Sequence, residues 1–275
     1  MPVGKAYSEN PRPLGLGSVM KEELKAIKDT FVPWTLALLG VSVFVFTFGM
    51  RQTVAGFYYP FPSIDSISAS LLRILMDRLI PSTVEVVALS PFNVFLSLIS
   101  ISLVLGLVVT FPLFFYKLVY YLSPGLYENE RKGLLKISIP ASLLFICGVL
   151  FAYYLVIPQT FSLLYMFAGA AGVGELFHVS QFVGLVLGLA VAVGLMFQLP
   201  IAMILLTRFG VVGNMFWREK WKHALVGILI LTAFVTPDGS GISMAMLSLP
   251  LVGLYLAGMK ISENGQRRVI NVQEV

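Results

Sequence analysis

Long stretches without a charged residue restrict most strongly how this chain can fold. No Asp, Glu, Lys or Arg occurs between Lys136 and Glu175, or again between His178 and Arg208. About a quarter of the residues in a soluble protein are charged, whereas this chain has 12% charged residues and a mean hydropathy of +0.88. Such a chain cannot cover itself with polar surface, so lipid must be part of its solvent.

The gaps between charges predict where the chain crosses the membrane, because a charge at the bilayer centre is costly. A span needs about 20 apolar residues. On this basis we expect an all-α membrane protein with six transmembrane helices, of which the fifth and sixth are short. The predicted spans are residues 29–51, 90–117, 136–157, 178–208, 224–237 and 238–260.

Two of the predicted boundaries have a local chemical signal. The second span should begin at Ser90-Pro91, where a serine cap precedes a proline at the first helical position. The last two spans are separated by the turn formers of residues 236–241. A single re-entrant element over residues 224–260 is the alternative to two helices. Beyond residue 157, we expect the chain to leave the third helix and form an outer, partly buried segment.

The distribution of Lys and Arg predicts the orientation. Sixteen of the 19 basic residues lie in the N-terminal segment, in two loops and after the last span, and only Arg51, Arg73 and Arg78 lie on the other side. We therefore expect both termini in the cytoplasm, with 1–29 and 260–275 as cytoplasmic tails of one membrane domain over 1–275. Basic residues that encode orientation also explain the net charge of +5 without a nucleic-acid partner.

Residues 51–89 form the largest predicted outer loop. Within it, Ser66 to Leu79 has apolar residues at helical spacing and charged residues elsewhere around the helix. This pattern predicts an amphipathic helix that lies on the membrane surface or caps the bundle.

Prolines recur inside or at the ends of the predicted spans. Each removes a helix hydrogen bond and tends to bend the helix. Together they predict curved helices that enclose a concave face. They are Pro112, Pro140, Pro158, Pro200 and Pro250.

Four short blocks, in this order, resemble a known family. The first block is Ser90-Pro91-Phe92, followed by the aromatic stretch that begins at Pro112 and by the run from Ser123-Pro124 to Glu130-Arg131. The others are Phe151 to Pro158, Phe197-Gln198-Leu199-Pro200, and Thr236-Pro237-Asp238 with Leu249-Pro250 after it. This order is similar to that of the TatC subunits of the twin-arginine protein translocase. The N-terminal family motif is reduced here to Glu23-Leu24-Lys25, so the chain resembles a divergent member.

The resemblance implies a binding site for twin-arginine signal peptides. It assigns Glu130 to the paired arginines of the signal, with Glu128 as a second acceptor and Tyr121 and Tyr127 as an aromatic lining. A guanidinium binds a carboxylate through two hydrogen bonds and stacks on aromatic rings. The alternative for Glu130 is a solvated loop carboxylate that pairs with a neighbouring basic residue.

The resemblance also implies a polar cavity within the membrane. Its candidates are Glu175, Gln159 and Gln198. An exposed carboxylate at the headgroup level is the alternative for Glu175, and helix–helix hydrogen bonding is the alternative for the two glutamines. Asp238 is expected to cap a turn. Three aromatic residues are expected to anchor the chain at the membrane interface: Trp217, Trp221 and Tyr255.

The implied function is the receptor and scaffold for export of folded proteins across the cytoplasmic membrane. Its partners would be signal peptides and single-span TatA-type or TatB-type subunits in an oligomeric complex, and its energy source would be the proton motive force. We expect no cofactor, no metal and no catalysis, since the sequence lacks a nucleotide-binding motif and a Cys/His cluster. A small-molecule transporter is the alternative, and it would need charged or unwound midplane sites in paired halves.

Overall fold

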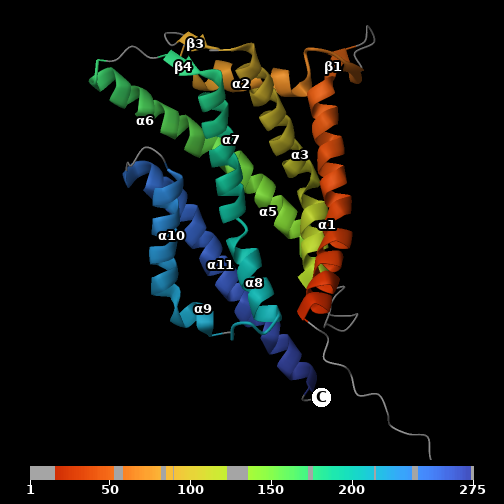
Figure 1. Ribbon diagram of the computed structural model, residues 1–275. Helices are drawn as coiled ribbons and strands as arrows, with labels where there is room; N and C mark the ends of the chain where they lie inside the picture. Colours follow the sequence, from red (N-terminus) through yellow and green to blue (C-terminus); the bar gives the residue numbers. More distant parts are fainter. Residues whose placement is uncertain are drawn as a thin grey trace, which may run out of the picture.

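The computed structural model describes residues 16–52, 58–81, 85–88, 90–122, 136–172, 176–213, 215–236 and 241–273. The chain is mostly helical, with short strands at one end of the bundle (Figure 1). In this described part, five helical stretches are long and apolar enough to cross a membrane: Ile27–Thr47, Pro91–Leu122, Ser138–Ala170, Val179–Arg208 and Gly241–Glu263. A shorter apolar helix, Trp221–Val235, lies where the short fifth span was predicted.

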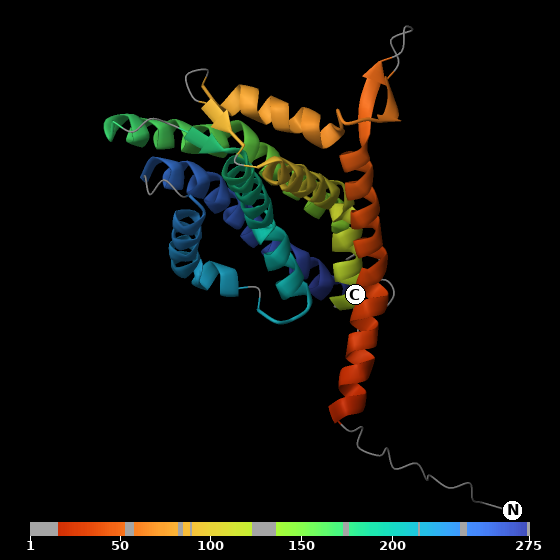
Figure 2. The same cartoon turned by 45° about the horizontal axis from the view of Figure 1, so that its top comes forward.

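Helices α1 (Leu16–Thr47) and α3 (Pro91–Leu122) run side by side along one edge of the bundle (Figures 1 and 2). They approach closely at Gly106 of α3. A side chain there would collide with Ser42 of α1 and would lie 3.2 Å from the carbonyl oxygen of Leu38. A small residue at the crossing lets the two backbones meet, as is usual where lipid provides no hydrophobic drive between helices.

The start of α3 confirms the predicted boundary. The backbone N–H of Phe92 donates to Ser90 Oγ at 3.2 Å, and Pro91 is the first helical residue. The serine thus satisfies one of the backbone N–H groups that a helix start leaves without a partner.

The third helix does not end near residue 157, and this corrects our expectation of an outer segment from there. Helix α5 (Ser138–Phe151) passes through a π-helical turn, η1 (Ala152–Val156), into α6 (Ile157–Ala170). Pro158 lacks the N–H of an ordinary helical residue, and the wider turn absorbs this loss without breaking the helix. Packing then supports the continuation, because Phe161 is buried and its ring centroid lies 5.3 Å from that of Phe182.

The fourth span is interrupted. Helix α7 (Val179–Met196) ends in a turn at Phe197 and Gln198, and α8 (Leu199–Arg208) follows with Pro200 in its first turn. α5 and α7 meet through two glycines, since a side chain on Gly148 would lie 2.9 Å from the Cα of Gly194.

The C-terminal elements follow α8, and the last of them packs on it. They are α9 (Phe216–Glu219), α10 (Trp221–Val235) and α11 (Gly241–Gln273), of which α11 contains Pro250. Gly258 of α11 faces Pro200, because a side chain there would lie 2.9 Å from the Cα of Pro200. α11 continues through Gln273, beyond the predicted end of the sixth span near residue 260.

Tyr255 and Trp217 depart from the expected role of interfacial anchors. Tyr255 is only 2% exposed, and its hydroxyl donates to the carbonyl oxygen of Trp217 at 2.6 Å. The Trp217 indole N–H donates in turn to Thr207 Oγ1 at 2.9 Å. Both polar groups are therefore used within the protein, whereas the ring of Trp221 is exposed as an anchor would be.

The short strands lie at one end of the bundle (Figure 1). Strands β1 (Phe48–Gln52) and β2 (Tyr58–Pro62) form an antiparallel hairpin. Strands β3 (Glu85–Val87) and β4 (Leu176–His178) form a short parallel pair. These strands were not predicted, because three to five residues are too few to show a period of two, and β3 and β4 pair across a long stretch of chain.

Helix α2 (Ile67–Leu79) confirms the predicted helix in the outer loop. Its buried face contains Leu72, Leu75 and Leu79. Ser66 caps its start, and Asp65 pairs with Arg73 on its exposed side. Figures 1 and 2 show α2 across the end of the bundle, where it covers the start of α3.

Candidate functional site

Aromatic side chains of α1 and α3 gather where α3 ends. The ring centroid of Tyr121, one residue before the end of α3, lies 5.9 Å from that of Phe31 on α1. Phe114, two turns earlier on α3, lies 6.2 Å from Phe31 and 4.8 Å from Trp34. The C-terminal end of α3 is therefore held against α1 by ring contacts.

Trp34 adds an unusual polar group to this aromatic cluster of Phe31, Trp34, Phe114 and Tyr121. Its indole N–H is buried and has no hydrogen-bond partner among the described residues. Buried donors are normally paired. The cluster thus offers ring faces that can contact a guanidinium, together with an N–H that can donate a hydrogen bond to a ligand oxygen or a water.

Most of the predicted signal-peptide site lies outside the described residues. The described chain stops at Leu122 and resumes at Lys136. Glu130, Glu128, Tyr127 and Pro124 all belong to residues 123–135, outside the described part of the chain. Tyr121 is the described member of the set, and it lies one residue before the end of α3.

Of the predicted polar-cavity residues, the two that the structure describes, Gln198 and Gln159, are not brought together. The Gln198 side-chain amide donates to the carbonyl oxygen of Ala141 at 3.1 Å, a bond between the α7–α8 turn and α5. Its Oε1 is buried and has no partner in the described part of the chain. This contact matches the helix–helix alternative for Gln198.

Gln159 lies at a different level of the bundle. Because α5–α6 and α7 run antiparallel, Ala141 is opposite Gln198 while Phe161, two residues after Gln159, is opposite Phe182. Positions 182 and 198 are 16 residues apart, which corresponds to about 24 Å along the helix axis. Glu175 lies outside the described residues, between Gly172 and Leu176.

The remaining predicted residues are structural. Pro112 lies within α3, Pro158 follows the π turn, and Pro200 is buried in the first turn of α8. Asp238 lies outside the described residues, in the connection between Thr236 and Gly241.

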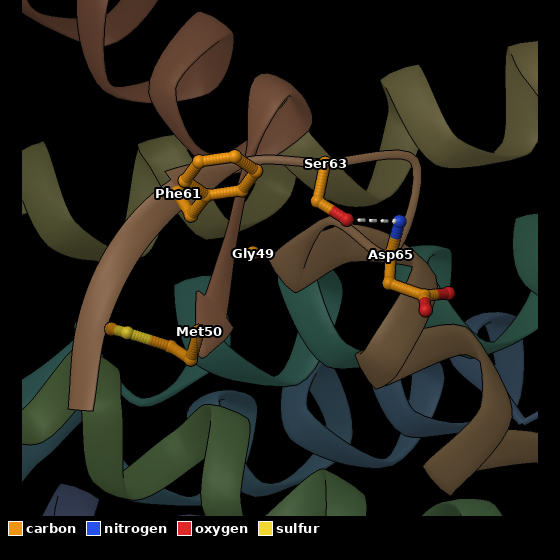
Figure 3. Close-up of a pocket in the computed structure, with 5 residues that line it drawn as sticks. All are labelled: Gly49, Met50, Phe61, Ser63 and Asp65. Carbon is orange, nitrogen blue, oxygen red and sulfur yellow. Dashed lines mark hydrogen bonds between the residues drawn. The ribbon is translucent and has the colours of Figure 1, made fainter. Parts of the chain in front are cut away.

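A shallow pocket of about 260 Å³ lies on the hairpin end of the molecule, far along α1 from the aromatic cluster (Figure 3). It is lined by Gly49, Met50, Phe61, Ser63 and Asp65. The backbone N–H of Asp65 donates to Ser63 Oγ at 3.0 Å, which closes the turn beside it. A side chain on Gly49 would collide with the carbonyl oxygen of Asp65, so glycine permits this close approach.

Sequence reasoning missed Phe31, Trp34 and Phe114 as neighbours of Tyr121. The spacing of three residues between Phe31 and Trp34, and of seven between Phe114 and Tyr121, places each pair on one helix face. That signal was present, but many aromatic pairs in the apolar spans share it. In the part of the chain that the structure describes, no group of three or more His, Cys, Asp or Glu side chains could hold a metal ion.

Comparison with known proteins gives a consistent result. Residues 23–250 match the family model of the Sec-independent protein translocase protein TatC. The TatC protein of the archaeon Cenarchaeum symbiosum is 36% identical over 212 residues, which are 77% of this chain and 80% of that protein. The chloroplastic TATC protein of Pisum sativum is 29% identical over 238 residues, which are 86% of this chain and 65% of the plant protein.

The fold also matches a solved structure. The crystal structure of the twin arginine translocase receptor TatC in DDM superposes with a TM-score of 0.67 at 24% sequence identity, and the match covers 87% of this chain and 99% of that one. At this identity the likeness concerns the fold.

Proposed function

This chain belongs to the TatC family of Sec-independent protein translocase proteins, and from that membership we propose that it is the signal-peptide receptor and core scaffold of a twin-arginine translocase. As a family member it is a membrane-embedded component of a protein translocase. The finer assignments below, on orientation, recognition, partners and energy, are the proposal.

We place the protein in the cytoplasmic membrane with both termini in the cytoplasm. The support is the unequal division of Lys and Arg, which retains the basic segments on the cytoplasmic side. In this orientation 1–29 and 260–275 are cytoplasmic tails, residues 51–89 are an outer loop, and α10 and α11 complete six spans. The aromatic cluster then lies at the cytoplasmic end of α1 and α3.

Recognition would rest on the loop after α3. Glu130 would accept two hydrogen bonds from a signal-peptide guanidinium, and Glu128 would serve the second arginine. A lone carboxylate in water binds weakly, because solvent screens exposed charge pairs. Tyr121 and Tyr127 would exclude water and contribute cation–π contacts.

The single observation that supports this site most directly is the packing of Tyr121 on Phe31 at 5.9 Å. It fixes where the loop leaves the membrane domain and presents aromatic surface at that point. Preorganised surface lowers the entropic cost of holding a flexible peptide.

Transport itself would use the proton motive force and single-span TatA-type or TatB-type partners in an oligomeric complex. The intramembrane polar residues Glu175, Gln159 and Gln198 would each lower the cost of moving polar cargo past them, and Pro158 and Pro200 would give the helices the curvature of a concave face. Because folded cargo is moved without a covalent step, no catalytic group is required.

The test is site-specific crosslinking combined with export. A photoreactive residue at position 121 should crosslink to a twin-arginine signal peptide, and Glu130→Ala should abolish both crosslinking and export while membrane insertion persists. A matched control is Glu219→Ala, an exposed carboxylate on α9 in another proposed cytoplasmic connection. Normal export by Glu130→Ala would remove the receptor role from Glu130.

A further inference from the structure

An arginine on α2 lies against two adjacent tyrosines of the third helix. The guanidinium carbon of Arg78 is 4.7 Å from the ring centroid of Tyr153 and 4.7 Å from that of Tyr154. The two rings are 4.9 Å apart and inclined at 74°. One cation therefore contacts two rings at once.

The π-helical turn η1 contains both tyrosines. The Ile157 N–H bonds the carbonyl oxygen of Ala152, five residues back, and Pro158 has no N–H to offer to the carbonyl oxygen of Tyr154. In a regular α-helix neighbouring side chains point about 100° apart. π turns are rare and occur frequently at functional sites, and here the turn coincides with the paired rings.

The charge of Arg78 is not neutralised within the described residues. Arg73, one and a half turns earlier on α2, pairs with Asp65, whereas Arg78 has no ion pair or hydrogen bond in that part of the chain. The tyrosine rings attract a cation but carry no full negative charge. The two tyrosine hydroxyls also have no hydrogen-bond partner among the described residues. Hydrogen-bond donors of the guanidinium and both hydroxyls are thus available to an anion.

A continuous apolar surface leads away from this Arg78–Tyr153–Tyr154 cluster. Exposed side chains follow one face of α5 at spacings of four, four, three and four residues, which is one side of a helix. They are Ile139, Leu143, Cys147, Leu150 and Tyr154. The surface covers 16 residues, whose ends lie about 22 Å apart along the helix axis, which is comparable to an extended acyl chain. A phospholipid site needs a charged group for the headgroup and an apolar surface for the acyl chain, and both are present here.

We propose that Arg78, Tyr153 and Tyr154 bind the phosphate of an anionic phospholipid in the leaflet on the α2 side, with an acyl chain along the exposed face of α5. Arginine binds phosphate oxygens in pairs, and tyrosines favour the headgroup level. A basic group at this level attracts anionic lipid. The bound lipid completes the contact between α2 and the third helix. This site is independent of the loop that would read the signal peptide.

Native mass spectrometry of the purified full-length protein tests the proposal. Phosphatidylglycerol and phosphatidylcholine with identical acyl chains are titrated separately, and bound lipids are counted. We expect one bound phosphatidylglycerol, whose affinity falls about tenfold in Arg78→Gln because the paired hydrogen bonds from the charged guanidinium to the phosphate are lost. Arg78→Lys should bind with intermediate affinity, because it keeps the charge but not the paired donors.

Two variants separate the lipid site from general effects of mutation. Arg73→Gln, on the same helix but already paired with Asp65, should bind phosphatidylglycerol as the unmodified protein does. Tyr154→Leu keeps the charge of Arg78 and the apolar surface of α5. It should still lower the affinity for phosphatidylglycerol measurably, because the tyrosine hydroxyl is lost. The thermal unfolding of each variant in lipid-free detergent reports whether it is folded.

The outcomes are decisive in both directions. Equal binding of phosphatidylglycerol and phosphatidylcholine, or unchanged phosphatidylglycerol affinity in both Arg78→Gln and Tyr154→Leu, would overturn the proposal. Inorganic phosphate is the second probe. If it displaces phosphatidylglycerol at equal concentration, the cluster is a free-phosphate site and the lipid assignment is wrong. If inorganic phosphate does not compete and Arg78→Gln lowers the affinity for phosphatidylglycerol, the results support a phospholipid site.

Discussion

The hydroxyl of Tyr255 on α11 donates a 2.6 Å hydrogen bond to the main-chain carbonyl oxygen of Trp217 on α9. Through the indole N–H of Trp217 the same connection reaches Thr207 on α8. A side chain within an apolar span thereby fixes the segment that precedes the short helix α10. The contact therefore connects α9, which precedes α10, to α11.

Tyr255→Phe should lower the free energy of unfolding by about 1 kcal/mol, the net value of a typical hydrogen bond. The loss should be larger if no water molecule replaces the tyrosine hydroxyl at the carbonyl oxygen of Trp217. Unfolding by denaturing detergent, followed by tryptophan fluorescence, measures the change. Tyr116→Phe is the matched control, because Tyr116 is exposed on α3 and its hydroxyl has no partner in the described chain. Equal effects of both substitutions would contradict the structural role of Tyr255.

The contact between α5 and α7 predicts a position that does not tolerate a methyl group. The Cβ of Gly194→Ala would lie 2.8 Å from the ring of Phe145 and 3.0 Å from Val149. We expect a loss of about 1–3 kcal/mol, as for other overpacked cores. Gly188→Ala on the same helix meets no atom within 4 Å and should be neutral or slightly stabilising. Thermal unfolding in detergent distinguishes the two variants.

Gln198→Leu tests whether this glutamine serves packing or transport. The substitution removes one interhelical hydrogen bond, worth about 0.6 kcal/mol on average within membranes, and also removes the unpaired Oε1. Stability should therefore change little. If Gln198 acts only in packing, export will continue at the normal rate. Lost export from a stable variant would instead place the amide in the transport path.

The length of α10 predicts local thinning of the bilayer. Its 15 residues span about 22 Å, whereas the hydrocarbon core is about 30 Å thick. A helix this short is accommodated by thinner lipid or by snorkelling of flanking lysines. Insertion of one turn of leucines after Gly227 should reduce export and leave signal-peptide binding intact.

The control for the longer helix is an insertion of equal length after Gly210, in the exposed connection that follows α8. That variant should export normally. Unchanged export by the lengthened helix, with helicity and membrane insertion confirmed, would exclude thinning from the mechanism.

The proposed orientation predicts opposite labelling at two engineered cysteines. In a Cys147→Ser background, Ile64→Cys should react with a membrane-impermeant maleimide added to intact cells, because Ile64 is 98% exposed at the hairpin end. Ile270→Cys should react only after the membrane is opened. External labelling of position 270 in intact cells would reverse the proposed topology.

Local signals in the sequence were sufficient for the main helices. The start of α3 at Ser90-Pro91, the outer helix α2 and the short α10 were all predicted at the right places. Each depends on interactions within a few residues, namely capping, helical periodicity and the cost of charge in lipid. The continuation of α6 beyond Pro158 was not predicted, because local rules favour an end there and packing of Phe161 on Phe182 supports the opposite.

The sequence by itself determined that the chain is a membrane protein, roughly where its apolar segments lie, and which family it resembles. Only the tertiary structure decided which faces meet. In lipid, a side chain against another helix and one against acyl chains are equally apolar, so hydrophobic periodicity does not separate them. Three contacts therefore depend on how helices distant in sequence fit together. They are the packing of Gly194 on Phe145, the hydrogen bond from Tyr255 to Trp217, and the position of Arg78 over the rings of Tyr153 and Tyr154.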